Sequence, residues 1–413
     1  MTDSVWRLAS FRWIIASQGW ALTGTVIGNV AIPLVAVTVL GAGAFELSMV
    51  SVARYLPNLL FSALLGIQVD RLRLRRAAVA ADWARAAILA IIPLAWMAGH
   101  LNLWLLIGVS AALGTVRIVF DLALSSAIPL LIPEHQRKRA NASFETLGTI
   151  ANVAGPGLGG LVVAVIGAPL ALLVNAVTYV ASALCLRRLP EPERPPTDEE
   201  AEGRKGWQVL GRGFVELARQ PVLVALIGAG ALSNMALMAF QSVYFAYALE
   251  QWGLSEFVAA AILVAVAFGT IVGNLAAEPW SNRTVARKIL MVAFSVGAVG
   301  SLPLLVLTQH PGAAIALLVT SFVLWGFAFG VSNVISTTYR QKVIPAAVMG
   351  RVLGAARTLV FGAFPFGAAA GGVVAGQWGF TGVAVLNVAL NLVAVTVLIL
   401  GLRHSRATEL SEI

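Results

Sequence analysis

The sequence predicts an all-α integral membrane protein of twelve transmembrane helices, arranged as two pseudo-symmetric six-helix bundles. Its composition is the first reason, because 59% of the residues are hydrophobic and 11% are charged, whereas soluble domains are about 25% charged. The second reason is a succession of apolar runs from Phe11 to Leu402, each long enough to cross about 30 Å of hydrocarbon as a helix. The third is an internal repeat. Together these observations exclude a soluble domain between the spans.

The expected spans each end at charge, Gly, Pro or a polar cluster. They are 11–39, 47–68, 77–98, 102–131, 143–166, 169–188, 221–249, 256–277, 288–308, 313–338, 353–376 and 380–402. The polar, proline-rich segment 189–220 is expected to be a cytoplasmic linker. Trp207, Leu210 and Phe214 follow a helical spacing that suggests an interfacial helix at its end. The chain is therefore predicted to comprise an N-terminal half (1–188), this linker, a C-terminal half (221–402) and a cytoplasmic tail (403–413).

The two halves align without a gap over long stretches when the sequence is shifted by 212 residues. Matching residues include Gly41 with Gly253, Gly159-Gly160 with Gly371-Gly372, and Asn175 with Asn387. Two halves of six spans each share one topology. This predicts a pseudo-two-fold axis along the membrane normal and a solute site between the halves, near the middle of the membrane.

The distribution of charge predicts location and excludes several classes of partner. Most of the 28 Lys and Arg residues fall in loops on one side, which places both termini in the cytoplasm of a bacterial cell, in its cytoplasmic membrane. The net charge of +9 lies in short loops, so no nucleic-acid partner is expected. Cys185 is the only cysteine, which rules out a disulfide within the chain and a cysteine metal site. We expect no cofactor, no metal, an uncleaved N-terminus and a monomer.

The loop between the second and third spans, GIQVDRLRLRR, contains Asp70 followed by four arginines. Arg71, Arg75 and Arg76 are the candidate functional residues among them. An aspartate can bind the positive N-terminus of a facing helix, and arginines can hold acids or lipid phosphates. The segment resembles the G-x-x-x-D-R-x-x-R-R loop of the major facilitator superfamily, which implies a latch on the cytoplasmic gate facing the eleventh span near Arg351. A plain positive-inside loop would explain the arginines but not Asp70, which becomes Asn282 in the repeat.

The fifth span carries a run of small residues around a proline, Gly155, Pro156, Gly159 and Gly160. This run is similar to the GPxxGG motif of the drug-antiporter branches of the same superfamily. The resemblance implies antiport. Generic close packing of helices through small residues is the alternative.

Three longer passages narrow the resemblance. IPEHQRKRANASFETLG, GRGFVELARQPVL and VIPAAVMGRVLGAARTL look like the branch that contains macrolide-efflux proteins and the enterobactin siderophore exporter. This resemblance covers nearly the whole chain. It implies efflux of an amphipathic small molecule such as a drug, antibiotic or siderophore, usually driven by protons as in multidrug resistance, and it does not name the solute.

Ionisable side chains inside the spans are functional candidates, because each costs at least a few kcal/mol there. Arg117 and Asp121 are four residues apart on one helix face, where they can pair. They form either a permanent ion pair or a site where protonation of Asp121 releases Arg117. The equivalent of Asp121 in the repeat is Asn333.

Further charges lie at or near span ends. Glu145 corresponds to Arg357 in the repeat, so the two either bridge an inner gate or lie separately at headgroup level. Arg54 either extends toward the outer surface or attracts an anionic solute. Asp82 and Arg85 are expected near the cytoplasmic surface in a structural role.

The resemblance implies that spans one, four, seven and ten line the cavity. The predicted solute-binding residues are Gln18, Thr25, Asn29, Arg54, Asn234, Met238, Gln241, Tyr244, Trp325 and Asn333. Amides, aromatics and methionine without a fixed charge suit a large apolar solute with hydrogen-bonding groups. Helix packing remains the alternative for each residue.

The sequence therefore predicts a secondary active exporter that works by alternating access, with proton antiport as its driving reaction. A proton-independent facilitator or a nutrient importer of the same fold is the alternative, because spans one and seven contain no acid. An enzyme is not expected, since the chain lacks HExxH, GxSxG and P-loop motifs.

Overall fold

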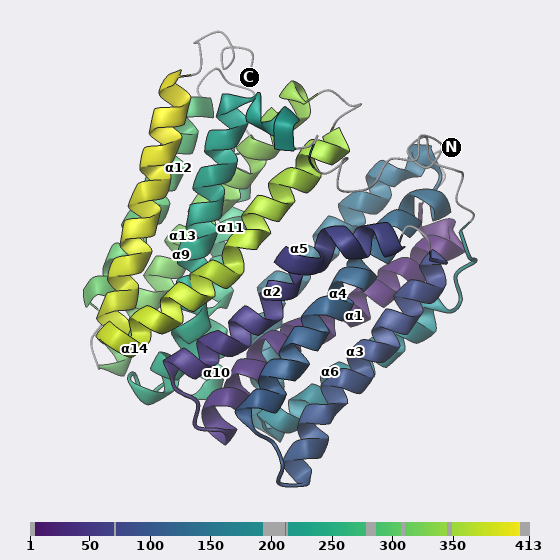
Figure 1. Ribbon diagram of the computed structural model, residues 1–413, viewed down its shortest axis with the longest axis horizontal. Helices are drawn as coiled ribbons and strands as arrows, with labels where there is room; N and C mark the ends of the chain where they lie inside the picture. Colours follow the sequence, from purple (N-terminus) through teal and green to yellow (C-terminus); the bar gives the residue numbers. More distant parts are fainter. Residues whose placement is uncertain are drawn as a thin grey trace. The chain divides into compact units, whose positions relative to one another are not determined.

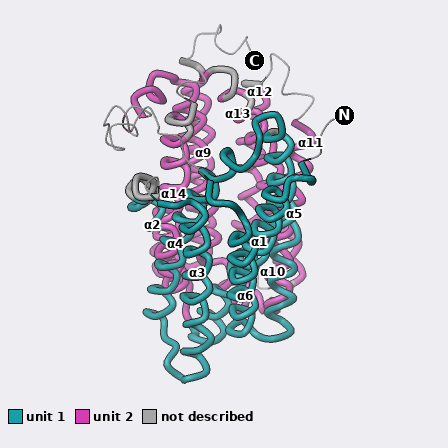
Figure 2. Tube along the Cα trace, turned by 90° about the vertical axis from the view of Figure 1, so that its right-hand side faces the viewer, with its two compact units in different colours: residues 1–41, 56–206 teal, residues 42–55, 207–413 magenta. Residues whose placement is uncertain are grey.

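The computed structural model describes residues 5–69, 72–192, 211, 214–277, 286–306, 310–344 and 349–404. All regular structure within these ranges is helical. The chain divides into two compact units (Figure 2), unit 1 with residues 1–41 and 56–206, and unit 2 with residues 42–55 and 207–413. The linker segment 193–210, the tail 405–413, and most of the expected interfacial helix lie outside the described residues, although residues 214–218 are helical.

Unit 1 is a bundle of long helices. Its helices are α1 (Ala9–Leu34) with a π-helical extension (Val35–Val39), most of α2 (Ala44–Val69), α3 (Leu74–Met97), α4 (Leu103–Leu131), α5 (Glu134–Ile166) and α6 (Ala168–Leu186). The central contacts pair α1 with α5 and α6, and α3 with α4 and α6. Helix α5 starts nine residues before the expected span, because the polar segment after Pro133 is rich in residues that favour helix.

Unit 2 holds the remaining helices (Figure 1). In this unit α9 runs beside α14, and α13 runs beside both α11 and α12. They are α9 (Pro221–Glu250), α10 (Glu256–Ile262), α11 (Val264–Ala277), α12 (Ala286–Val299) with a short turn of 3-10 helix (Leu302–Val306), α13 (Pro311–Val343) and α14 (Met349–His404).

The predicted fold class is confirmed. Within the described residues, ten helical segments are long and apolar enough to cross a membrane. Helix α14 covers the last two predicted spans, because Gly379 (φ 62°, ψ −162°) interrupts its helical backbone between them. Helix α2, which carries Arg54 and Pro57 in its interior, corresponds to the second span. Each of the twelve predicted spans therefore has its helix.

The internal repeat is visible in the backbone as well as in the sequence. Gly41 (φ 63°) and Gly253 (φ 62°) are separated by the repeat shift, and so are Gly167 (φ 82°) and Gly379 (φ 62°). Positive φ strains any residue with a side chain, so glycine is required at such turns. The two halves therefore leave their first and fifth spans through matching glycine turns.

Matching glycines also bring helices together in both halves. In unit 1, Gly155 and Gly159 of α5 lie against Val26 and Val30 of α1. In unit 2, their equivalents Gly367 and Gly371 of α14 lie against the backbone of Met235 and Ala239 of α9. Small residues allow two helix backbones to approach closely. The GPxxGG-like motif thus has a packing role that the repeat shares, although the repeat replaces Pro156 by Ala368.

A buried asparagine joins two helices at equivalent places in each half. Asn175 of α6 faces Gly24 of α1 so closely that a side chain at Gly24 would collide with it. Asn387 of α14 donates from Nδ2 to the carbonyl oxygen of Ala236, 2.7 Å away on α9. Ala236 is the repeat equivalent of Gly24. An asparagine of the sixth span thus lies against the first span in each half, and in unit 2 it also forms a hydrogen bond across the contact.

Candidate functional site

Unit 2 encloses a cavity of about 710 Å³ between α9, α12, α13 and α14. This volume is in the range of pockets that hold drug-sized molecules. Its polar lining consists of Ser233, Asn234, Ser332, Asn333, Ser336, Arg340, Arg357 and Asn391. Its aromatic lining consists of Phe294, Trp325, Phe329, Phe361 and Phe364. The cavity can therefore contact both the apolar body and the polar groups of a solute.

In unit 1, the space equivalent to part of this cavity is filled by a buried charged cluster. The carboxylate of Asp82 is 0% exposed, pairs with the Arg85 guanidinium and accepts a 2.5 Å hydrogen bond from the Ser182 hydroxyl. That guanidinium lies between two rings, 3.9 Å from the centroid of Phe120 and 4.4 Å from that of Tyr179. We call Asp82, Arg85, Phe120, Tyr179 and Ser182 the arginine plug.

The repeat replaces the three largest members of the arginine plug by smaller residues. Arg85 becomes Gly297, Phe120 becomes Ser332 and Tyr179 becomes Asn391. All three replacements line the cavity of unit 2. Loss of side-chain volume at equivalent positions is thus one physical reason why unit 2 is hollow at this place.

Asp82 and Arg85 are predicted to have a structural role. Both are buried, and Asp82 lies about 12 Å along α3 from its first residue. Thr25, a predicted cavity residue of α1, lies 3.3 Å from the Tyr179 hydroxyl. Sequence spacing does not reveal this cluster, because its members come from α3, α4 and α6.

One end of the cavity wall is held by a chain of hydrogen bonds. The Trp325 indole donates to the Ser301 hydroxyl at 3.0 Å, and Asn391 donates to the same oxygen at 3.2 Å. The Asn391 amide also donates to the Asn387 side chain at 3.1 Å. The Trp325 ring is therefore fixed in orientation, with Phe240 and Phe322 packed against it.

Two arginines add positive charge to the cavity wall. Arg357 is predicted as a gate residue, and it lines the cavity, as does Arg340. These two cations join the amides and aromatic rings that are predicted for the cavity wall. Arg340 is missed because the tenth span is predicted to end at residue 338, although α13 continues to Val343. Arg340 continues the predicted polar stripe, four residues after Ser336 and seven after Asn333.

Of the predicted solute-binding residues, Asn234, Trp325 and Asn333 line the cavity. Two others are buried in the packed interior. Tyr244 is 1% exposed and donates its hydroxyl to the carbonyl oxygen of Ala259 at 2.8 Å, and Met238 is 6% exposed.

The remaining predicted solute-binding residues are not among those that line the cavity. In unit 1, Gln18 is half-buried and Asn29 is exposed, both on α1. In unit 2, Gln241 of α9 and Arg54 of α2 are half-buried.

The Arg117–Asp121 pair is present on α4, with 3.6 Å between Nε and Oδ2. Its side chains are 49% and 44% exposed, so Asp121 is accessible in a way that Asp82 is not. Glu145 is exposed on α5.

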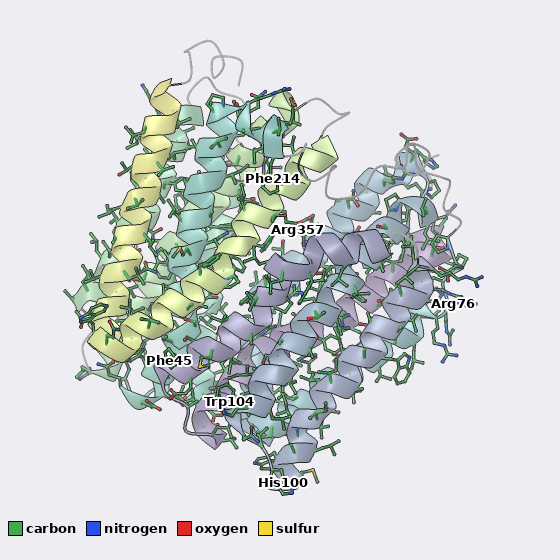
Figure 3. All side chains as sticks on the ribbon, in the orientation of Figure 1. Phe45, Arg76, His100, Trp104, Phe214 and Arg357 are labelled. Carbon is green, nitrogen blue, oxygen red and sulfur yellow. The ribbon has the colours of Figure 1, made fainter. Side chains whose placement is uncertain are left out.

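Part of the predicted latch is described. The Arg75 backbone amide at the start of α3 donates to Oε1 of Glu191 at 3.0 Å, and its guanidinium lies 3.4 Å from Oε2 and donates to the carbonyl oxygen of Leu189. Arg76 is exposed at the opposite end of unit 1 from His100 (Figure 3). Asp70, Arg71 and the side chain of Arg351 lie outside the described residues.

The described residues contain no group of three or more His, Cys, Asp and Glu side chains that could hold a metal ion. Aromatic faces, amides, hydroxyls and guanidinium groups are the cavity's means of recognition.

A family model described as Major Facilitator Superfamily matches residues 16–365. The chain belongs to this superfamily. It is consequently a transporter of small molecules and not an enzyme. Membership also confirms the resemblance predicted from the loop and span motifs.

Curated relatives are efflux proteins at low identity. The multidrug efflux pump Tap of Mycolicibacterium fortuitum is 26% identical over 78% of this chain and 79% of its own length. Macrolide efflux protein A of Streptococcus pyogenes is 22% identical over 88% of each chain. This chain is thus a multi-pass membrane protein like these bacterial pumps.

Solved structures share the fold. A bacterial homologue of the iron transporter ferroportin in its inward-facing state aligns with a TM-score of 0.72 at 15% identity, over 97% of this chain and 99% of its own. A D-xylose-proton symporter aligns with a TM-score of 0.68 at 14% identity, over 94% and 96%. The two proteins are named for different solutes, iron and D-xylose, so the fold by itself does not identify the solute.

Proposed function

We propose that this protein is a secondary active exporter of amphipathic small molecules in the bacterial cytoplasmic membrane. The observation that carries the proposal is the drug-sized cavity of unit 2, whose wall combines five aromatic rings with amide and hydroxyl groups. Such walls suit a bulky solute with scattered polar groups. The efflux activities of the curated relatives agree with export. The halves 1–188 and 221–402 would rock about the solute in a monomer with both termini in the cytoplasm.

Proton antiport is the proposed driving reaction, with Asp121 as the proton carrier. Asp121 is half-exposed and pairs with Arg117, so protonation would cancel its charge and release that guanidinium. This change acts on helix α4, which packs against α3. A local proton event would thereby reach the interior of unit 1.

The proposed inner gate uses the remaining charged residues. Asp70 would bind the N-terminus of α14 near Arg351, while Arg71, Arg75 and Arg76 hold acids or headgroup phosphates. Glu145 and Arg357 would form a further ion pair when the gate is closed. Gly155, Pro156, Gly159 and Gly160 would keep α5 close to α1 while the gate moves.

Transport in proteoliposomes tests the proposed coupling. A pH gradient should drive accumulation of a fluorescent amphipathic dye, and Asp121→Asn should abolish the gradient dependence while leaving passive flux. Glu250→Gln, an exposed acid at the end of α9, is the matched control and should behave as the natural protein. If flux in both directions ignores the gradient and is unchanged in Asp121→Asn, antiport is excluded.

A proton-independent facilitator or importer is the second candidate. It is favoured by the absence of Asp and Glu from the first span and from the body of the seventh. In that case the Arg117–Asp121 pair would be permanent. Net uptake down a concentration gradient, equal at every pH gradient, would establish this function instead.

A further inference from the structure

We propose that the solute held by the unit 2 cavity carries an acidic group, which Arg340 and Arg357 bind. This inference rests on the proposed transport function and names the chemical class of its substrate. The class is an organic acid with an apolar, ring-bearing body.

Arg340 is held in place on the cavity wall. It is half-buried on α13, and its Nε donates to the Ser336 carbonyl oxygen at 3.1 Å. Its Nη2 donates to the Thr337 hydroxyl at 3.0 Å. A guanidinium has five N–H donors, so these two bonds orient the group and leave donors for a ligand.

Arg357 is held in a different way. Its guanidinium lies over the Phe361 ring, 5.3 Å from the centroid, and Phe361 in turn contacts Phe364 edge to face at 5.3 Å. Stacking on a ring orients the planar group while its edge donors stay open. An arginine ordered in this way suits a planar carboxylate or a sulfonate.

Within the described part of unit 2, no ion pair joins Arg340 or Arg357 to a protein carboxylate, and the acid Glu216 pairs with Arg219. Like charges that line one cavity disfavour each other, and an anion bound between them relieves this. When the gate is open and Glu145 is not paired with Arg357, a ligand acid supplies that anion.

The remaining wall determines the rest of the ligand. Trp325 lies 15 residues before Arg340 on α13, or about 22 Å along the helix. Asn333 lies between Trp325 and Arg340 along α13, and Asn391 binds the same Ser301 hydroxyl as the Trp325 indole. A matching solute therefore has an acid at one end, neutral hydrogen-bonding groups in its middle and an aromatic or aliphatic body at the other end.

Binding by the purified full-length protein in phosphatidylcholine nanodiscs tests the inference. The probe is anilinonaphthalene sulfonate, and its matched control is N-phenyl-naphthylamine, which has the same ring system without the sulfonate. We expect Arg340→Gln and Arg357→Gln each to weaken sulfonate binding by at least about tenfold, as follows from loss of a charge-assisted hydrogen bond. Binding of the neutral dye should change by less than about twofold, which also reports that the cavity is intact.

Further variants separate charge from shape. Arg219→Gln removes an exposed arginine of unit 2 that lies before α9 and off the cavity wall, and it should leave binding of both dyes unchanged. Arg340→Lys keeps the charge and should retain part of the sulfonate affinity. Equal losses for both dyes in the Arg→Gln variants, or no loss for the sulfonate, would overturn the inference.

Two final arms identify the source of the acid and keep the two proposals separate. If phosphatidylglycerol added to the nanodiscs displaces the sulfonate, the acid is an anionic lipid. If it does not, the acid is a soluble solute.

Transport of the sulfonate, the neutral dye and ethidium is then compared in proteoliposomes. Charge-dependent binding with no transport of any dye would refute the exporter and leave the acid-binding cavity, whereas transport with charge-independent binding would refute only the inference.

Discussion

The two halves of this chain descend from one six-helix pattern, yet they differ most at one set of equivalent positions. In unit 1 these positions hold the arginine plug, in which Arg85 lies between the rings of Phe120 and Tyr179. In unit 2 they hold Gly297, Ser332 and Asn391, which line a cavity. The same helix arrangement therefore serves as a packed charged interior in one half and as a binding space in the other.

The two halves therefore share their helix contacts but differ in the side chains that face their interiors. The glycine turns and the asparagine contact recur in both halves, so they belong to the fold. Side-chain size at a few inward positions decides whether the interior is filled. A half can thus become a binding site through a small number of substitutions, without rearrangement of its backbone.

The largest expected effect comes from breaking the arginine plug. Asp82→Ala should destabilise the protein by about 3–5 kcal/mol, because it leaves the buried Arg85 charge without a partner. Thermal unfolding of purified protein in detergent measures the loss. Asp121→Asn, at a half-exposed pair, should cost no more than about 1 kcal/mol. Asp82→Leu combined with Arg85→Met should recover most of the stability, and failure to recover would mean that the charges themselves are required.

Replacing a shared glycine by alanine should lower stability by different amounts in the two halves. A methyl group at Gly371 would collide with the carbonyl oxygen of Ala239 on the backbone of α9. A methyl group added at Gly159 would lie 3.1 Å from a methyl group of the Val30 side chain. That side chain can shift. Gly371→Ala should therefore lower stability by about 1–3 kcal/mol, and Gly159→Ala by clearly less. Equal melting temperatures for the two variants would contradict this ranking.

Copying a plug residue into unit 2 should close part of the cavity. Ser332→Phe introduces the ring that Phe120 supplies in unit 1 and should reduce dye transport by about tenfold or more through steric exclusion. Val385→Phe adds a similar bulk on an exposed face of α14 and should transport normally. Dye transport by Ser332→Phe at the rate of Val385→Phe would contradict the assignment of this position to the cavity.

The smallest effect is expected at the start of α3. Glu191→Gln keeps an acceptor for the Arg75 amide but removes the charge that faces its guanidinium. Both side chains are partly exposed, at 29% and 27%, so the loss should stay below about 1 kcal/mol and shrink in high salt. Melting curves at low and high ionic strength measure it. A larger loss that persists in salt would make this contact a main support of unit 1.

The sequence by itself determined the fold class, the twelve spans and the repeat, because a bilayer demands long apolar helices and leaves their pattern visible in one dimension. It also supplied Asn234, Trp325 and Asn333, which follow helical periodicity along single spans. Residues recognisable from one helix alone were therefore within reach of sequence reasoning.

Only the tertiary structure decided which inward positions are filled and which are hollow. Asp82 and Tyr179 are 97 residues apart in sequence, and their meeting around Arg85 depends on how α3, α4 and α6 pack. Whether Arg357 gates a path or lines a cavity likewise depends on the helices around it, and Arg340 joined the cavity because α13 is longer than its apolar segment. Cavities are set by the summed volume of side chains from several helices, a quantity that no single stretch of sequence contains.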